Sequence, residues 1–204
     1  MLNSTRSATG LHSQWGFTLV ELMVTLSLLG ILSALAAPSF SVWLRNSQVR
    51  TVAETLQSGI RLAQAEAIRR NRRVVFALTN AQPSPSAVVT AEENGKNWAI
   101  YTIPQPGETA EFIQYGALGA TGGTVGITGQ ASVCFNSLGR PVTNSSTETG
   151  TGGACALPTT PYDIEQADAE LGTDRRLSVT VALGGQVRMC DRDRARSTSP
   201  DGCS

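Results

Sequence analysis

The most informative part of the chain is FTLVELMVTLSLLGILSALAA, residues 17–37. These twenty-one residues carry one charged side chain, and their number is about what a helix needs to cross the hydrocarbon core of a bilayer. A buried helix of a soluble protein is the alternative, but the run is longer and more uniformly apolar than most core helices. The sequence therefore predicts a transmembrane helix over residues 17–37.

A polar leader, residues 1–16, precedes the apolar run and ends in Gly16. It holds Arg6 as its one strong cation and His12, the single histidine of the chain. An ordinary secretory signal has its small-residue cleavage site after the apolar region. Cleavage between Gly16 and Phe17 would instead leave the apolar helix on the product, so we expect the leader to be removed and the anchor to remain.

Glu21 is the charged residue inside the apolar run. A charge at the centre of a bilayer costs about 2.5–3.5 kcal/mol or more unless it is neutralised or partnered. Once Phe17 is the N-terminus, Glu21 is the fifth residue, and the amine of a neighbouring subunit can pair with it. We therefore expect Glu21 to be an assembly contact that fixes the register of subunits.

The segment GFTLVELMVTLSLLGILSALAAP, residues 16–38, resembles the prepilin signature of type IV pilins and type II secretion pseudopilins. The resemblance rests on Gly16 before the cut, Phe17 at the first mature position, Glu21 at the fifth and Pro38 at the twenty-second. In that family a prepilin peptidase cuts after the glycine and methylates the new N-terminus. The resemblance thus implies cleavage between Gly16 and Phe17 and N-methylation of Phe17.

Beyond the membrane, the helix is expected to continue as an amphipathic half over residues 38–72. Pro38 removes one helical hydrogen bond, so we expect a kink there and no helix end. The arginines of this half are interpreted as a solvated face and not as a binding site. Apolar residues at steps of three and four predict a stripe that lies on a head domain: Val49, Val52, Leu56, Ile60, Ala63 and Ala67.

Residues 73–204 are expected to form a periplasmic, β-rich head. Strand-like runs are RRVVFALT (72–79), NWAIYTIP (97–104), EFIQYGAL (111–118), ASVCFN (131–136) and RRLSVTVAL (175–183). Segments 81–86, 119–129 and 143–154 are rich in Pro, Gly, Ser or Thr and are expected to be turns and connections. The expected fold class is α+β.

The second half of the chain also has a family resemblance. The segments CFNSLGRPV (134–142) and RRLSVTVALGGQVRMC (175–190) resemble the GspH/FimT branch of these proteins. This resemblance implies a pilin fold, in which a long N-terminal helix packs against an antiparallel sheet head. Residues 81–129 show no motif that we can assign.

Some FimT-like members bind DNA for uptake through a Gly-Arg-x-Arg motif near the final strand, and the matching residues here, 185–188, lack the first arginine. Asp191 and Asp193 alternate with the following arginines and reduce the local positive potential. A DNA-binding minor pilin is therefore the disfavoured alternative, and DNA the disfavoured partner. The candidate DNA-binding residues are Arg188, Arg192, Arg194 and Arg196.

The four cysteines are spread over the second half of the chain without a C-x-x-C pair, so a zinc site is not expected. A chain that crosses a membrane enters an oxidising compartment, where disulfides are the default. Three pairings exist, and we favour the sequential one because it closes short local loops. It joins Cys134 with Cys155 and Cys190 with Cys203.

An enzyme is not expected. The formal net charge is zero, and the mature chain without residues 1–16 contains no histidine for acid–base chemistry. No nucleophile elbow or P-loop is present in the sequence. Asp191, Asp193 and Asp201 lack the spacing of a calcium loop. We therefore expect no catalytic residues, no metal and no cofactor.

The expected function is that of a minor pilin or pseudopilin, assembled into a type IV pilus or a type II secretion pseudopilus. A place near the filament tip and a role in starting assembly are expected. The expected partners are other pilins or pseudopilins, the prepilin peptidase and the inner-membrane assembly platform. The expected location is the bacterial inner membrane, with one pass and a periplasmic head, and then the filament.

Overall fold

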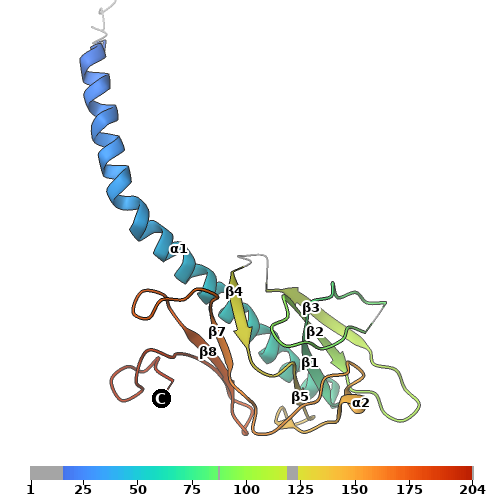
Figure 1. The fold of residues 1–204 in the computed structure, drawn as a ribbon. Helices are drawn as coiled ribbons and strands as arrows, with labels where there is room; N and C mark the ends of the chain where they lie inside the picture. The colour runs from blue at the N-terminus through green and yellow to red at the C-terminus, as the bar shows by residue number, and fades with distance from the viewer. Residues whose placement is uncertain (1–15, 87, 119–123, 204) are drawn as a thin grey trace, which may run out of the picture. The chain divides into compact units, whose positions relative to one another are not determined.

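The computed structural model describes residues 16–86, 88–118 and 124–203. It contains one long helix followed by two antiparallel sheets (Figure 1), which confirms the α+β class. The chain divides into two compact units, Met1–Ser41 and Val42–Ser204. The leader, with Arg6 and His12, lies outside the described residues except for Gly16.

Helix α1, Leu19–Arg70, keeps its helical backbone through position 38. The kink expected there stays a prediction. The helix ends as the sequence suggests, because Asn71 adopts a left-handed conformation with φ of 52°. The Asn71 amide donates to the carbonyl of Ile68 and the Arg72 amide to that of Ala67, at 3.2 and 3.1 Å. This pair of bonds closes the last turn of the helix.

The first sheet has the strand order β3-β2-β1-β5-β6. In register, Phe76 of the central strand lies opposite Ile100 on one side and Val133 on the other. Four of these strands fall inside runs that the sequence predicts, and the short β6 does not. The bounds are β1 Val74–Thr79, β2 Asn97–Thr102, β3 Phe112–Ala117, β5 Ser132–Phe135 and β6 Pro141–Val142.

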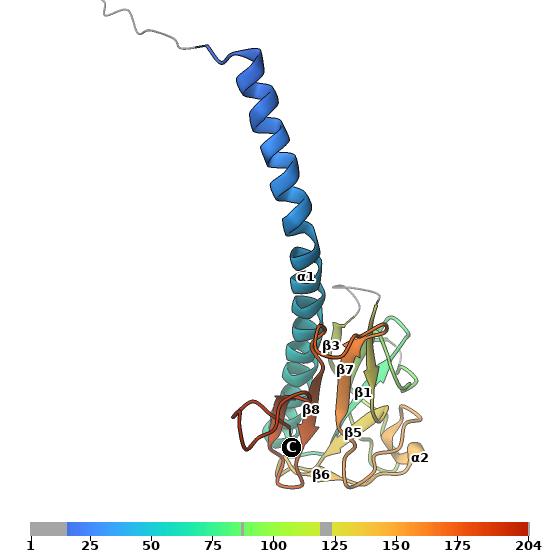
Figure 2. The ribbon, with the colours of Figure 1, turned by 60° about the vertical axis from the view of Figure 1, so that its left-hand side comes forward.

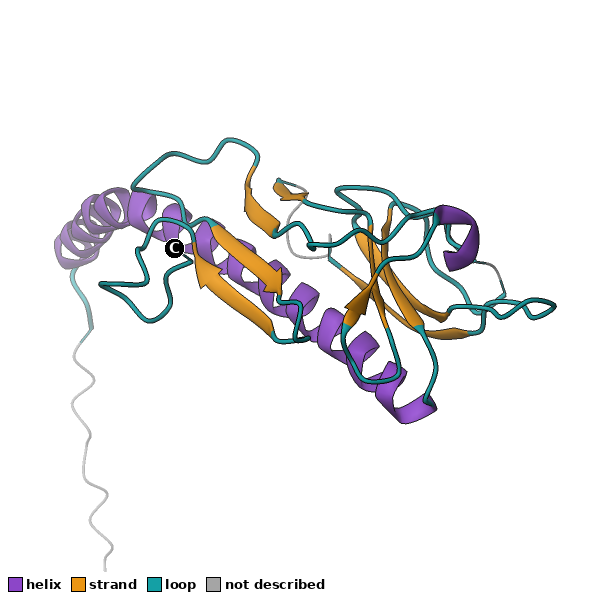
Figure 3. Cartoon of the chain, turned by 90° about the horizontal axis from the view of Figure 1, so that it is seen from below, coloured by secondary structure: helices purple, strands orange, loops and turns teal. Residues whose placement is uncertain are grey.

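The second sheet has the order β4-β7-β8-β9 and is again antiparallel. Ile127 lies opposite Ile164, and Val179 lies opposite Met189. Figure 3 shows part of this sheet, the β8 and β9 pair, running alongside the head portion of α1. The bounds are β4 Val125–Thr128, β7 Tyr162–Gln166, β8 Leu177–Val181 and β9 Val187–Asp191.

Two segments expected to be connections contain regular structure, so those expectations were wrong. Segment 119–129 includes β4, whose four residues gain their stability from pairing with β7 and not from a local pattern. Segment 143–154 includes α2, Ser146–Thr149. Its turn is set by Glu148, whose carboxylate accepts from the Ser145 amide at 2.8 Å, as in a capping box.

The main core lies between α1 and the two sheets. Every residue of the predicted apolar stripe is buried, and Ala53 joins it. The stripe contacts inward-facing side chains of both sheets, such as Phe76, Ile100, Ile164 and Val179. A second cluster, which includes Val75, Tyr101 and Cys134, covers the other face of the first sheet. Strand β1 is therefore buried on both faces.

Candidate functional site

The apolar end of α1 begins with a side-chain cap. The hydroxyl of Thr18 accepts from the amide of Glu21 at 3.2 Å, and its carbonyl accepts from the amide of Leu22 at 3.1 Å. This cap was not among the predicted features, although Thr-x-x-Glu over residues 18–21 is the pattern of a capping box. The carboxylate of Glu21 also lies in the first turn, where the helix dipole favours negative charge. The helix thus starts at Leu19, with Thr18 as its cap.

Residues Leu19–Ala37 of α1 are long and apolar enough to cross a membrane, and none of them is buried. The hydroxyls of Thr25 and Ser27 donate to the carbonyls of Leu22 and Met23 at 2.9 and 2.8 Å. These two polar groups are satisfied inside the helix, as an apolar environment requires. The length, hydropathy and exposure of this segment fit a membrane-anchored protein.

The carboxylate of Glu21, unlike these hydroxyls, has no hydrogen-bond partner among the described residues. Among the residues that the structure describes, no side chain or amide bonds to it, and it is exposed. Gly16 and Phe17 are also exposed, with open space around Gly16. The predicted cut site, Phe17 and the acidic group are therefore not covered by other described residues of the chain. Their roles in cleavage, methylation and assembly stay predictions.

Within the head, Arg45 joins α1 to the connection between β7 and β8. Its guanidinium donates to Asp174 at 3.0 and 2.8 Å and to the carboxylate of Asp168 at 3.0 Å from two of its nitrogens. Asp174 is buried, and Arg45 holds the pKa of the Asp168 carboxyl below its ordinary value. We call this set the Arg45 clamp. It corrects the interpretation of Arg45 as part of a solvated face.

The arginines proposed for DNA contacts are held by other groups of the head. Arg188 donates to the carbonyls of Pro200 and Gly202 at 2.8 and 3.2 Å. Arg192 pairs with Glu165 at 3.1 Å and Asp163 at 3.4 Å.

Arg194 pairs with Asp201 at 3.0 Å and Asp191 at 3.6 Å. Arg196 is exposed and has no ion pair with any described residue. Three of the four candidate arginines therefore already bond to carboxylates or carbonyls of the head. The described residues of this segment do not present a row of unpaired cations that could contact DNA phosphates.

Two disulfides organise the head, in the sequential pairing that loop length favours. Cys134 of β5 joins Cys155, and Cys190 of β9 joins Cys203 near the end of the chain. The second disulfide closes the segment that carries Arg192 to Asp201. The backbone supports the same closure, because the Asp191 amide donates to the carbonyl of Asp201 at 2.7 Å.

The acidic residues of this segment form ion pairs with arginines. Asp191 accepts from Arg175 at 3.2 Å, and Asp193 pairs with Arg176. The guanidinium of Arg176 holds the pKa of Asp193 below its ordinary value. Among the described residues, no group of three His, Cys, Asp or Glu side chains is placed to hold a metal ion.

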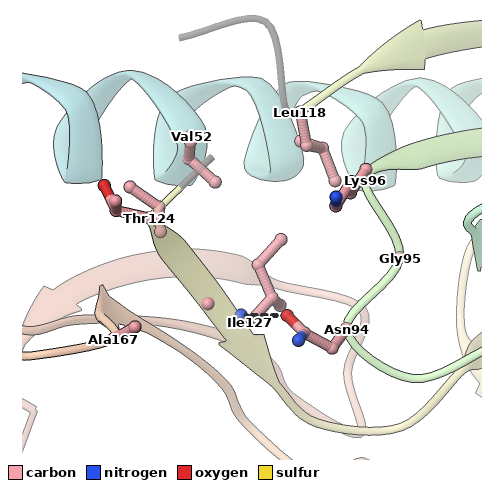
Figure 4. A pocket seen from close by; sticks show the side chains of 10 residues that line it. Val52, Asn94, Gly95, Lys96, Leu118, Thr124, Ile127 and Ala167 are labelled. Carbon is pink, nitrogen blue, oxygen red and sulfur yellow. Dashed lines mark hydrogen bonds between the residues drawn. The ribbon is translucent and has the colours of Figure 1, made fainter. Parts of the chain in front are cut away.

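A pocket lies where the two sheets meet α1 (Figure 4). Val52, Leu118 and Ile127 contribute apolar side chains to it, and the described residues that line it include no histidine, cysteine or carboxylate. The side-chain oxygen of Asn94 accepts from the amide of Ile127 at 2.7 Å, which satisfies a backbone group of strand β4. The described lining offers packing and hydrogen bonds, and Lys96 is the one charged side chain among the described residues that line it.

Two family models match the chain. The first, described as the prokaryotic N-terminal methylation motif, matches residues 12–37 and so includes the junction between Gly16 and Phe17. The second, described as type II transport protein GspH, matches residues 52–185.

Several known proteins are similar to parts of the chain. A fimbrial protein of Pseudomonas aeruginosa is 36% identical over 70 residues, which are 34% of this chain and 44% of that protein. A type IV major alpha-pilin of Moraxella bovis is 39% identical over 49 residues, 24% of this chain and 31% of that protein. The chain thus matches less than half the length of these relatives.

Among solved structures, the type IV minor pilin FimU of Pseudomonas aeruginosa aligns over 78% of this chain and 96% of that one, with 17% identity and a TM-score of 0.48. The GspH model spans well over half of the residues, and the methylation motif precedes it at the apolar helix. The chain therefore belongs to the GspH family of pilin-like proteins.

Proposed function

We propose that this chain is a minor pilin or pseudopilin subunit that is assembled into a type IV pilus or a type II secretion pseudopilus. The observation that carries the proposal is the carboxylate of Glu21. It lies in the first turn of an exposed apolar helix, and the described residues offer it no partner. A helix of this kind needs both an apolar environment and an external cation.

The proposed processing follows from the same segment. A prepilin peptidase cuts between Gly16 and Phe17 and methylates the amine of Phe17. Support comes from the methylation motif over residues 12–37 and from the exposure of both residues. The Thr18 cap forms the first turn from residues on the product side of the cut, so it remains after cleavage.

The proposed assembly step pairs Glu21 of one subunit with the Phe17 amine of its neighbour. Both groups then lie among apolar side chains, where an ion pair is stronger than in water. A misplaced subunit would leave a charge unpaired in this environment, which is costly. The pair therefore acts as a register device between subunits.

Pilins assemble with other pilins, and we propose the same partners here, together with the prepilin peptidase and the inner-membrane assembly platform. The chain resides in the bacterial inner membrane with a periplasmic head until it enters the filament. Two disulfides in the head support an oxidising compartment. Its role is structural and not catalytic. We also propose a place near the filament tip and a role in starting assembly.

The test compares Glu21→Ala and Glu21→Gln with the parent in the native host. Membrane fractionation measures insertion, and analysis of sheared filaments measures incorporation. Both variants should insert as well as the parent, because removing a charge from the apolar run eases insertion. Incorporation should fall about tenfold or more, since a charge-assisted hydrogen bond contributes roughly 1.5–3 kcal/mol.

Glu54→Ala is a matched control, because Glu54 is an exposed glutamate of the same helix that pairs only with Arg50 among the described residues. It should leave both measurements unchanged. Parental incorporation of both Glu21 variants would refute the assembly contact. Loss of both variants from the membrane would show that insertion was the step that failed.

A further inference from the structure

An exposed tryptophan lies on α1 at the start of the unit that contains the head. Trp43 is 63% exposed and its neighbour Leu44 is 45% exposed, both large values for apolar side chains. At steps of three, four and seven residues, the same face of α1 continues with polar residues that are all exposed: Ser47, Arg50, Thr51 and Glu54. This face of the helix therefore changes from apolar to polar between Leu44 and Ser47.

The position of this change along the helix matches the edge of a bilayer. The apolar span Leu19–Ala37 ends six residues before Trp43, which is about 9 Å at 1.5 Å per helical residue. The headgroup region extends about 5–8 Å beyond each side of the hydrocarbon core. Helical side chains lean toward the N-terminus of their helix, by about one residue, which brings the indole ring closer to the span. The ring is therefore expected at the depth of the lipid headgroups.

Tryptophan is a side chain that this depth favours. Its indole is a large apolar ring with one N–H donor, so the ring can contact acyl chains while the N–H donates to lipid esters or water. Trp and Tyr are enriched at membrane–water interfaces for this reason. A tryptophan at position 43 therefore fits the headgroup layer better than it fits open water.

The first basic residue after Phe17 is Arg45, two positions beyond Trp43. Basic residues at a membrane surface are commonly attracted to anionic lipids. The guanidinium of Arg45 is instead paired with the carboxylates of Asp168 and Asp174 in the clamp. Arg45 is therefore already neutralised by the head, and attraction to a lipid surface at this level must come from apolar contact and not from bound phosphate.

The depth of Trp43 also fixes the height of the head, because the β7–β8 connection is bonded to the next turn of α1. The side chain of Asn46 donates to the carbonyl of Thr173 at 3.3 Å and accepts from the amide of Arg175 at 2.7 Å. Figure 2 shows this connection reaching α1. The β7–β8 end of the head is therefore attached within about one helical turn of Trp43.

We propose that Trp43 lies in the headgroup layer of the periplasmic leaflet while the chain resides in the membrane, so that the β7–β8 end of the head rests on the lipid surface. The partner is the interface of zwitterionic phospholipids, which the indole ring and Leu44 contact. Lipid is favoured as the occupant because no charged residue separates Trp43 from the apolar span. The inference rests on the proposed function, since it requires the span in a membrane and the head on the periplasmic side.

Fluorescence quenching tests the depth of Trp43, because the chain has three tryptophans and two can be replaced. The full-length chain with Trp15→Phe and Trp98→Phe keeps Trp43 as its one tryptophan, whether or not the leader is removed. It is reconstituted in phosphatidylcholine vesicles, and flotation measures its association with them. A nitroxide on the lipid headgroup should quench the fluorescence about twofold or more above a nitroxide near the end of the acyl chain. Adding anionic phosphatidylglycerol should leave this ratio unchanged.

The matched control carries Trp15→Phe and Trp43→Phe and so keeps Trp98, which is 6% exposed in the core of the head and should not be quenched. If Trp98→Phe destabilises the head, the Trp15→Phe chain minus this control gives the signal of Trp43. Stronger quenching by the deep nitroxide, or quenching only with phosphatidylglycerol, would overturn the inference and leave the proposed function intact. An unquenched Trp43 in chains that float with the vesicles would also overturn it, because protein would then cover the ring. Chains that do not float would contradict the membrane anchoring itself, on which the proposed function depends.

Discussion

Replacing Leu56 by alanine should lower the free energy of unfolding of the head by about 3 kcal/mol, within the range of about 2–5 kcal/mol for buried leucines. Leu56 is on the buried stripe of α1 and is 0% exposed. It belongs to the core cluster that includes Phe76, Ile100 and Ile164, so both sheets line the space that the substitution would empty. The surrounding strands are paired and cannot collapse freely into this space.

Thermal unfolding of the full-length chain in detergent, followed by the circular dichroism of its strands, measures the effect. A loss of about 3 kcal/mol corresponds to a fall in Tm of roughly 6–12 °C for a chain of this size. Leu183→Ala is the matched control, because Leu183 is exposed and its loss should cost less than about 0.5 kcal/mol. A loss below 1 kcal/mol for Leu56→Ala would show that α1 does not form part of the head core.

Three other predictions follow from the head. Replacing Cys134 and Cys155 together by serine should lower the free energy of unfolding by about 3 kcal/mol, as chain entropy gives for a sequence separation of 21, and equal stability with and without reductant would contradict it. Arg45 lowers the pKa of Asp168, so their pairing stabilises the fold above about pH 4 and is lost as pH falls through the lowered pKa. Arg45→Gln should therefore flatten the acid limb of a stability–pH curve, and an unchanged limb would exclude this contribution. Arg188→Ala should change DNA retention by less than twofold at physiological salt, and a tenfold loss would restore the DNA-binding alternative.

The parts of the fold predicted from the sequence depend on local patterns. The apolar run of α1 has a length set by the bilayer, and the stripe from Val49 to Ala67 follows the helical period. Strands β1, β2, β5 and β8 are rich in β-branched or aromatic residues, so their signal lies within a few residues.

The parts missed depend on distant partners. Strand β4 contains a glycine and forms because β7 pairs with it. The Arg45 clamp joins residues 123 and 129 positions apart, and no feature of a single sequence indicates which arginine meets which carboxylate. The same limit applies to the C-terminal arginines. The sequence shows that aspartates alternate with them, whereas only the fold shows that Glu165 reaches Arg192.

Some residues of the candidate site could be predicted from the sequence, and others could not. Gly16, Phe17 and Glu21 could be selected from their order around the start of the apolar run, because the position of a charge in such a run has few explanations. The Thr18 cap was visible in the sequence as a capping-box pattern. The exposure of Leu171 and Leu183 could not be predicted, because an exposed leucine in a sequence has the same identity as a buried one.

The most direct test of the central claim is the intact mass of the chain in filaments sheared from the native host. The expected mass is that of residues 17–204 with one methyl group on the amine of Phe17 and two disulfides. Its presence in purified filaments would support a processed, assembled subunit. A chain that retains residues 1–16, a chain cut after Ala37, or filaments that lack the chain altogether would contradict the account.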